Sequence, residues 1–425
     1  MRRYQTIILW ILLIGALVLA LLTYRSYRNG QSNTPVPAQN QEVDVTATKP
    51  LAPFDYQNAY TQAHIAANKE AVYQLQTDGT VTFLVVTDLH VNSLDDARFD
   101  QLRDVVALTR SVKVDFVAVL GDLLRDPIDH ESAMALLKKT HEILDLAACP
   151  VYYTHGDHDY NAADETYGTT PEEYASIITA SDWASICLTD SKLVRDLKNP
   201  NGGYFYVDLP EKHHRAIFLN SYEIGFNEDG SPRSNEDGSM GYWISGIKTK
   251  TQVDWLVQNA LNLDGKSGWS VSFFSHVIPY REDLSQEARP FHGYGKDNAP
   301  LRKLVQAFEN GTSWSGRYND TIPELSVDFK KQGKTPVIGW WGGHIHDDCY
   351  ARIDDLNLFV SASTCAHARD SWSHDEHPVH LPPPRNDTNL AMSVNLFVSN
   401  PDRRQVNVVK FGSTSAQGMV TEFPY

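Results

Sequence analysis

The sequence predicts an α/β fold whose strands are buried on both faces. Apolar, β-rich runs occur at residues 81–86, 114–120, 150–154, 271–275 and 335–341. Two segments with helical periodicity, 95–111 and 131–147, separate the first three runs, and the aspartates that follow these runs are 34 and then 35 residues apart. This spacing is typical of βαβ units, in which a crossover helix connects two parallel strands. Continuous apolar runs of this kind indicate a sheet that helices cover on both sides.

The composition is that of a folded globular protein. Hydrophobic residues make up 42% of the 425 residues and charged residues 21%, which excludes a disordered chain. The four cysteines show no CxxC spacing, so no zinc ribbon or disulfide framework is expected. The net charge of −16 argues against a basic surface that holds duplex nucleic acid, but it does not exclude phosphate chemistry at bound metal ions. The sequence carries no signal for oligomerisation.

Residues 1–28 are predicted to form an N-terminal membrane anchor with short basic flanks. Residues 7–22 are almost entirely apolar, and the uncharged stretch from 4 to 24 has 21 residues, whereas about 20 suffice to cross a bilayer core of about 30 Å. A cleaved signal peptide is the alternative, but the apolar run is long for one and no A-x-A-like site follows it. The arginines on either side narrowly favour a cytoplasmic N-terminus. We therefore expect a single-pass protein of the cell membrane, with its folded domain outside the cytoplasm.

The rest of the chain is predicted to be one domain on a tether. Residues 29–50 are polar, contain prolines and show no periodicity, as in a flexible linker. Residues 51–425 are expected to form the domain, with the motif-bearing core at 81–365 and a C-terminal β-hairpin within 390–412.

Three further segments carry expectations. The segments 221–250 and 281–334 are long for connections between strands, so we expect loops that shape access to a site. Between them, residues 251–261 are expected to form a helix. Residues 365–384 contain His367, His374, His377 and His380, whose irregular spacing favours a solvated loop over a further metal site.

Each of the five apolar runs ends on residue types that bind metal ions. In chain order these are Asp88-Leu89-His90, Gly121-Asp122, Gly156-Asp157-His158-Asp159, His276 and Gly343-His344-Ile345-His346. Ligands in open α/β sheets bind beyond the carboxyl ends of the strands, so the five clusters are expected to converge. A single aspartate after a strand is usually a cap or a turn former. Five such clusters at successive strand ends instead predict one shared site.

This set of motifs resembles the calcineurin-like metallophosphoesterases, whose pattern is D-x-H, G-D, G-N-H-D or G-N-H-E, a single H, and G-H-x-H. The resemblance covers about residues 81–365. It implies a four-layer αββα sandwich of two mixed sheets, here preceded by a single transmembrane helix, with a dinuclear metal centre between the strand ends. It implies that one ion is held by Asp88, His90 and His346, that the other is held by Asp157, His276 and His344, and that Asp122 bridges them.

The resemblance also implies a reaction. It would be the hydrolysis of a phosphate ester, either a diester or a monoester, by a hydroxide that bridges two divalent ions. The ligand types suit Mn, Fe or Zn without choosing among them. His158 would protonate the leaving group or stabilise the transition state. The alternative is a binding or scaffold protein at the membrane that keeps the fold and has weakened catalysis.

Two positions depart from the family pattern. The family usually has Asn where this chain has Asp157, and many relatives have an acid at the position of Arg125 to orient the catalytic histidine. Asp126 or Asp159 could take over that orienting role, Arg125 could contact phosphate, or Arg125 could be a surface residue.

The aspartate at position 157 changes the charge of the implied centre. Three aspartates and a hydroxide give a formal ligand charge of −4, which cancels two divalent ions, whereas an asparagine would leave +1. We therefore expect tighter metal binding, a higher pKa for the bridging water and weaker attraction of an anionic substrate.

Overall fold

The computed structural model describes residues 69–96, 98–125, 128–161, 176–223, 246–279, 299–346, 348–361, 363–364, 393–412 and 420–425. All of them belong to the unit Pro50–Tyr425, which internal contacts separate from the unit Met1–Lys49. The predicted anchor, the linker and the histidine-rich segment 365–384 lie outside the described residues. Within the described ranges, no helix has both the length and the apolar character needed to cross a bilayer.

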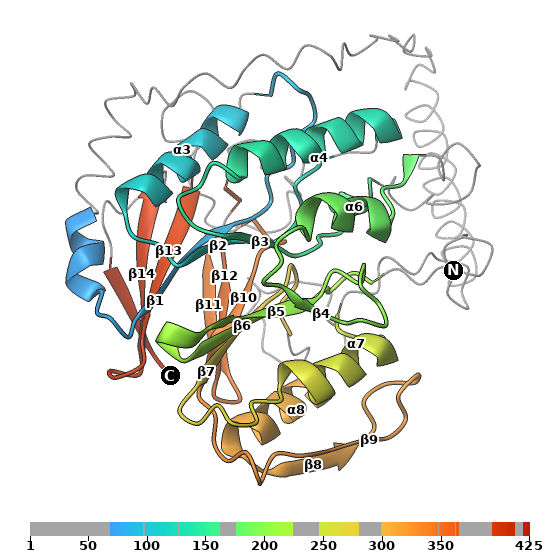
Figure 1. The fold of residues 1–425 in the computed structure, drawn as a ribbon, viewed down its shortest axis with the longest axis vertical. Helices are drawn as coiled ribbons and strands as arrows, with labels where there is room; N and C mark the ends of the chain where they lie inside the picture. Colours follow the sequence, from blue (N-terminus) through green and yellow to red (C-terminus); the bar gives the residue numbers. More distant parts are fainter. Residues whose placement is uncertain are drawn as a thin grey trace, which may run out of the picture. The chain divides into compact units, whose positions relative to one another are not determined.

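Two mixed β-sheets form the centre of the domain (Figure 1). The first has six strands in the order β15-β14-β13-β1-β2-β3. Its strands are β1 (Val81–Val86), β2 (Phe116–Val119), β3 (Val151–Tyr153), β13 (Ser393–Asn400), β14 (Gln405–Gly412) and β15 (Val420–Pro424). The pairs β1–β2 and β2–β3 are parallel, and the connections between them are α3 (Arg98–Ser111) and α4 (His130–Leu144). The predicted βαβ units are therefore confirmed.

The C-terminal strands complete the first sheet. Strands β13 and β14 form an antiparallel hairpin, and β13 also pairs antiparallel with β1 from Val81↔Ser399 to Val85↔Asn395. Strand β1 consequently lies inside the sheet, between one strand that follows it closely in the chain and another from near the C-terminus.

The second sheet has seven strands in the order β11-β12-β10-β7-β6-β5-β4. Its strands are β4 (Val194–Arg195), β5 (Phe205–Leu209), β6 (His214–Phe218), β7 (Ser270–Phe274), β10 (Val337–Gly342), β11 (Cys349–Ile353) and β12 (Leu356–Val360). Four adjacent strands, β6, β7, β10 and β12, run parallel. Their carboxyl ends consequently lie at the same edge of this sheet, as those of β1, β2 and β3 do in the first sheet.

Helices cover the outer faces of both sheets, as Figure 1 shows. Helices α3, α4 and α6 (Ala180–Cys187) pack on the first sheet, whereas α7 (Lys250–Trp255) and α8 (Ala299–Asn310) pack on the second. Aromatic rings fill the space between the sheets. The ring centroid of Phe83 in β1 lies 5.3 Å from that of Phe274 and 5.0 Å from that of Trp341, both in edge-to-face contact. The prediction of an α/β fold with two mixed sheets is confirmed.

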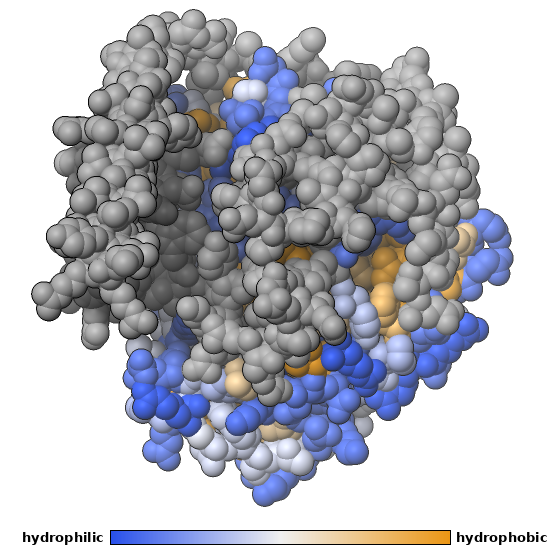
Figure 2. Space-filling model, turned by 180° about the vertical axis from the view of Figure 1, so that it is seen from behind, coloured by the Kyte–Doolittle hydropathy of each residue, from blue (hydrophilic) through white to orange (hydrophobic). Residues whose placement is uncertain are grey.

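Apolar side chains lie mostly between these layers. On the face that Figure 2 shows, hydrophilic residues accordingly form most of the described surface.

The helix predicted at 251–261 begins regularly and ends irregularly. Thr249 is its N-cap and accepts a hydrogen bond from the Gln252 backbone N–H. After α7 the chain continues as a π-helical turn over Leu256–Ala260. The buried Arg215 guanidinium donates to the carbonyls of Asn259, Ala260 and Asn262, so it satisfies the carbonyls at the end of this turn.

The expectation of a long access-shaping loop over 281–334 is wrong for residues 299–334, which contain regular structure, whereas residues 281–298 lie outside the described residues. Helix α8 occupies residues 299–310, and a hairpin of β8 (Ser313–Gly316) and β9 (Leu325–Asp328) follows it. The buried residues of α8 include Leu301, Leu304, Val305 and Phe308. These positions have the i, i+3, i+4, i+7 spacing of an amphipathic helix, so the sequence did contain the signal.

Candidate metal centre

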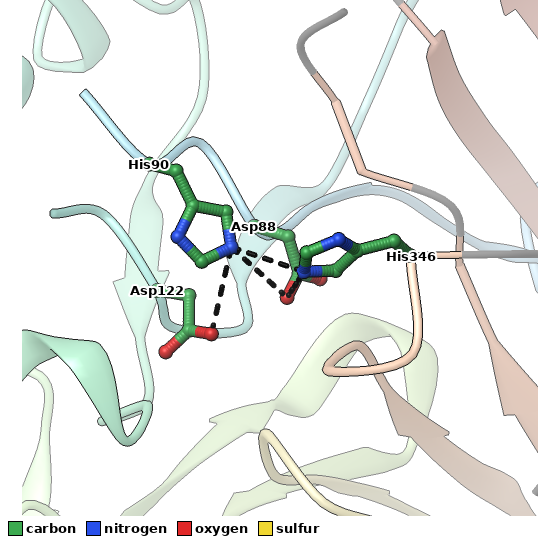
Figure 3. A group of neighbouring side chains, drawn as sticks. All are labelled: Asp88, His90, Asp122 and His346. Atoms are coloured by element: carbon green, nitrogen blue, oxygen red, sulfur yellow. Dashed lines mark hydrogen bonds and ion pairs between the residues drawn. The ribbon is translucent and has the colours of Figure 1, made fainter. Parts of the chain in front are cut away.

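The seven predicted ligand residues come together beyond the carboxyl ends of five strands. They form two groups of four that share Asp122, and within each group the candidate ligand atoms all lie within 4.8 Å of one another. The first group is Asp88, His90, Asp122 and His346, and the second is Asp122, Asp157, His276 and His344. Figure 3 shows the first group, whose side chains point toward one another from three separate loops.

The separations within the first group fit a small divalent ion. His90 Nε2 lies 3.0 Å from His346 Nε2, and His346 Nε2 lies 3.3 Å from Asp88 Oδ1. Metal–ligand bonds of about 2.0–2.2 Å place neighbouring ligand atoms roughly 3 Å apart. His90 Nε2 is also 3.7 Å from Asp122 Oδ2. Two imidazoles and two carboxylates are a donor set that suits Mn, Fe or Zn.

The second group is equally compact. His276 Nε2 lies 3.0 Å from Asp157 Oδ1 and 3.2 Å from Asp122 Oδ2, and His344 Nδ1 lies 3.3 Å from Asp157 Oδ1. Asp157 Oδ1 is buried and receives no hydrogen bond of good geometry from the described residues. An ion between these atoms would satisfy this oxygen. Asp122 Oδ2 faces both groups, which is the placement expected of a bridging ligand.

Five of the seven candidate ligands have left-handed backbone conformations. The φ angles are 54° at Asp88, 50° at His90, 55° at Asp122, 74° at His344 and 58° at His346. Such conformations cost on the order of 1–3 kcal/mol each outside glycine, and they cluster at functional sites. Backbone hydrogen bonds hold them here, since Asp88 N donates to Gly121 O and His90 N donates to Asp122 O, each at 3.0 Å. These hydrogen bonds restrain the backbone of the loops that carry the candidate ligands.

Neighbouring groups orient the ligand atoms. His276 Nδ1 lies 2.6 Å from the Leu120 carbonyl oxygen, which can only accept, so Nδ1 carries the proton and Nε2 is left for an ion. The Thr87 hydroxyl donates to Asp88 Oδ2 at 2.7 Å and leaves Oδ1 facing His346. The sequence analysis did not identify either contact. For Thr87, the only signal in the sequence is its position next to Asp88. A backbone carbonyl such as that of Leu120 has no signal, because every residue type carries one.

The carboxylates of the centre are ionised and the His90 ring is neutral. Burial alone would raise the pKa of Asp88, but His346, His276 and His90 hold it well below its usual range. The pKa of Asp157 is likewise held low, against burial, chiefly by His344 and His276. Burial lowers the pKa of His90 to about 3, so its Nε2 keeps its lone pair. Burial opposes the charged form of His276 and His346, but Asp122 raises the pKa of His276 and Asp88 raises that of His346. Metal ligands must be deprotonated, so binding of an ion at these two rings would release protons.

Asp159 connects two of the ligand loops. Its Oδ1 accepts from Leu123 N at 2.7 Å, and its Oδ2 accepts from Asp122 N at 3.1 Å and from Gly156 N at 2.9 Å. Burial and the Asp122 charge raise the pKa of this carboxyl to about 6. These contacts give Asp159 a structural role, in which it fixes the backbone of the loops after β2 and β3.

The group that orients the His158 ring is a backbone carbonyl. His158 Nδ1 lies 2.5 Å from the carbonyl oxygen of Arg125, so the ring donates there and directs Nε2 toward the centre. Arg125 thus contributes through its main chain, whatever its guanidinium contacts. Asp126, the other candidate for orienting this ring, lies outside the described residues.

Gly343, which precedes His344, packs closely against Thr87 and Asp88 of the first ligand group. A Cβ atom on Gly343 would clash with Thr87 Oγ1 and would lie 2.5 Å from Asp88 Oδ2. Gly343→Ala is therefore expected to displace the Asp88 carboxylate, to weaken binding of one ion by about 10- to 100-fold, and to cost about 1–3 kcal/mol of stability. Calorimetric metal titration and thermal denaturation measure both effects. Gly79→Ala, whose Cβ would meet only Pro401 at 4.0 Å, is the control, and equal metal affinities in the two variants would contradict the prediction.

The chain is similar to known proteins in sequence and in fold. The sequence matches the model of the calcineurin-like phosphoesterase family over residues 81–348. The fold is similar to a dimetal phosphatase from Danio rerio, with a TM-score of 0.51 and 14% identity over 81% of this chain and 99% of that chain. A purple acid phosphatase from yellow lupin (Lupinus luteus) seeds gives a TM-score of 0.43 and 11% identity over 82% of this chain and 53% of that chain. No curated protein sequence matches. Since the family model spans more than half of the chain, this protein belongs to the calcineurin-like phosphoesterase family.

Proposed function

We propose that this protein hydrolyses phosphate esters with two divalent ions held at the candidate metal centre. The observation that carries the proposal is the position of Asp122, whose Oδ2 lies 3.7 Å from His90 Nε2 in one group and 3.2 Å from His276 Nε2 in the other. Two ions that share this carboxylate would supply Lewis-acid stabilisation of a phosphoryl group and a nucleophilic water at neutral pH. The residues suit Mn, Fe or Zn.

His158 is the group best placed to supply a proton. Its side chain is 26% exposed, whereas that of His276 is fully buried, so a substrate can reach it. Burial opposes the charged ring, but Asp122, Asp157 and the Arg125 carbonyl raise the pKa of His158 to about 9 in the metal-free protein. A protonated imidazole at the edge of the centre can donate to a leaving oxygen.

The complete ligand set favours an enzyme over a scaffold. A protein that had lost catalysis would be expected to lose ligand residues, whereas all seven candidate positions carry metal-binding side chains and lie together. The net charge of −16 also favours a small phosphate ester over duplex nucleic acid.

Association with the membrane is part of the proposal and rests on the sequence alone. The apolar run at 7–22 would anchor the chain in the cell membrane with the catalytic domain outside the cytoplasm. Protease treatment of intact cells tests this topology, because an extracytoplasmic domain would be digested whereas a cytoplasmic one would be protected.

Hydrolysis of model substrates tests the activity. The full-length protein in detergent, stripped of metal and reloaded with Mn²⁺, is expected to bind two ions and to hydrolyse bis-p-nitrophenyl phosphate, p-nitrophenyl phosphate or both. The ratio of the rates on the diester and on the monoester shows whether the protein is a diesterase or a monoesterase. Two bound ions without turnover on either substrate or on a wider panel of phosphate esters would support the scaffold alternative.

Asp157→Asn measures what the additional carboxylate does. We expect binding of one ion to weaken by about 10- to 100-fold, KM for an anionic ester to fall, and the activating ionisation in the pH–rate profile to move to lower pH, because one negative charge leaves the centre. The control is Asp320→Asn, whose native side chain is 92% exposed. Unchanged turnover and an unchanged pH profile in Asp157→Asn would show that the charge at this position has no effect on catalysis.

A further inference from the structure

A tyrosine packs against two histidines of the second ligand group. Tyr222 is fully buried, and its ring centroid lies 5.8 Å from that of His276 and 6.1 Å from that of His344. One flat ring thus contacts two candidate ligands that come from different strands. With Val277 and Tyr160 it forms a small apolar cluster. This cluster is distinct from two larger cores, a first core that includes buried residues of α3, α4 and α6 and a second core that includes buried residues of α7 and α8.

The segment around Tyr222 is fastened to the His276 loop. Ser221 Oγ accepts a hydrogen bond from Val277 N at 3.0 Å, directly after His276. Leu219 N donates to Phe274 O at 2.8 Å, so residues 219–222 continue along β7 past the end of β6. The Tyr160 hydroxyl donates to the Tyr222 carbonyl. A shift of this segment would therefore move the surroundings of His276.

A buried glutamine in α7 sets the position of the segment. Gln252 is fully buried, its Oε1 accepts from Asn220 N and its Nε2 donates to Asn220 O, both at 2.9 Å. The same Nε2 donates to Glu223 Oε2 at 2.7 Å, and Asn220 Oδ1 accepts from Tyr222 N at 2.8 Å. One side chain thus satisfies both main-chain groups of Asn220 and also binds the side chain of Glu223, the residue after Tyr222.

These contacts have the properties of an orienting network. A buried polar network in which the members satisfy one another holds a single arrangement, because breaking one contact leaves buried groups unpaired. Groups that orient metal ligands without touching the ion typically change metal affinity by about 10- to 100-fold. A ring packed against an imidazole limits the rotation of that imidazole. Because a histidine loses this rotational freedom when it binds an ion, a ring that is already restricted binds the ion at a smaller entropic cost.

We propose that Tyr222 and Gln252 are positioning residues for the second ion. Gln252 sets the backbone of residues 220–223, that backbone seats the Tyr222 ring, and the ring holds His276 and His344 in the orientation that binds metal. The inference rests on the proposed dinuclear centre, and it adds residues that lie outside the family's ligand motifs.

Metal titration of the full-length protein tests the proposal. Mn²⁺ is titrated into the metal-free wild type and into the variants Tyr222→Leu and Gln252→Leu, while calorimetry follows the two binding steps. Tyr222→Leu removes the ring but keeps an apolar side chain, and Gln252→Leu removes the amide but keeps a similar volume. Both variants are expected to weaken one step by about 10- to 100-fold and to leave the other within about twofold. The weakened step should be the one that His276→Ala removes, whereas His90→Ala should remove the other. Electron paramagnetic resonance should show a spin-coupled ion pair in the wild type and a signal of isolated Mn²⁺ in the variants at the same loading.

Two further variants separate positioning from general stability. Tyr222→Phe keeps the ring and is expected to retain both steps. Val253→Ala removes a buried core side chain from the same helix on the side of the second core, so it should lower the melting temperature and leave both steps unchanged. If both Mn²⁺-binding steps kept their wild-type affinity in Tyr222→Leu and Gln252→Leu, the inference would be overturned. Equal weakening of both steps would overturn it as well. A wild type that takes up fewer than two ions would instead overturn the proposed function, and this inference with it.

Discussion

Asp122→Ala is expected to abolish hydrolysis and to leave at most one tightly bound ion per chain. Asp122 belongs to both candidate groups, and its Oδ2 faces His90 Nε2 in one and His276 Nε2 in the other. Its Oδ1 accepts from His158 N at 3.0 Å, so the same carboxylate also fixes the loop that carries the proposed proton donor. No other side chain of the described residues belongs to both groups.

The expected loss is at least about 10³-fold in kcat/KM. Metal-based charge stabilisation is worth several kcal/mol in the transition state, and each 1.36 kcal/mol corresponds to about a factor of ten in rate. Hydrolysis of p-nitrophenyl esters measures the rate, and elemental analysis after gel filtration measures the ions retained.

The control must show that the fold survives. Asp320→Ala removes an exposed carboxylate and is expected to behave as the wild type. Thermal denaturation of the metal-free proteins separates the loss of a ligand from unfolding. Retention of more than a tenth of the wild-type rate by a folded Asp122→Ala would exclude a bridging role for this residue.

His158→Asn is expected to lower kcat for alkyl phosphate esters by about 10²–10⁴-fold while both ions remain bound. The proposed part of His158 is to give a proton to the leaving oxygen, and general acid catalysis contributes about this much. The loss should be small for p-nitrophenyl esters, whose leaving group departs readily as an anion, and large for alkyl esters, whose alkoxide needs the proton. A role in binding alone would lower both substrate classes equally.

His158→Asn is also expected to change how the rate of hydrolysis depends on pH. The pKa of His158 in the metal-free protein is about 9, above its ordinary 6.5, because Asp122 and Asp157 outweigh the effect of burial. An acid must be protonated to act, so the rate of the wild type should fall as the pH rises through this pKa. Bound cations repel the proton and move this decline to lower pH. The variant should lack the decline, and a decline that persists in His158→Asn would assign it to another group.

The strands and the ligand types could be predicted because both are local in the sequence. Strand β1 is the run 81–86, as predicted, and β2, β3, β7 and β10 fall within two residues of the predicted ends. The candidate metal ligands follow these strands directly. Parallel pairing brings those after β1, β2 and β3 to one edge of the first sheet and those after β7 and β10 to one edge of the second. The helical spacing in α8 is equally local, since the buried residues Leu301, Leu304, Val305 and Phe308 recur at i, i+3, i+4 and i+7.

The supporting contacts could not be predicted because they join positions that are far apart in the chain. Leu120 O accepts from a ring 156 residues away, and Gln252 reaches Asn220 across 32 residues. The left-handed φ at His90 and His346 is also invisible locally, since nothing marks a histidine for that conformation until the neighbouring strand fixes it. The roles assigned to individual site residues stay predictions for the experiments above.

The pairing of β1 with β13 also governs when the centre can form. Strand β1 supplies Asp88 and His90 at its end, yet one of its two partners is residues 393–400, more than 300 residues later. Until that partner has been synthesised, β1 presents an open edge with apolar side chains on both faces, which is a template for aggregation. Pairings at such sequence separation are the slow steps of folding. Formation of the loop after β1 is thus coupled to synthesis of residues 393–400, and a chain truncated before residue 393 would expose the strand that precedes the candidate ligands Asp88 and His90.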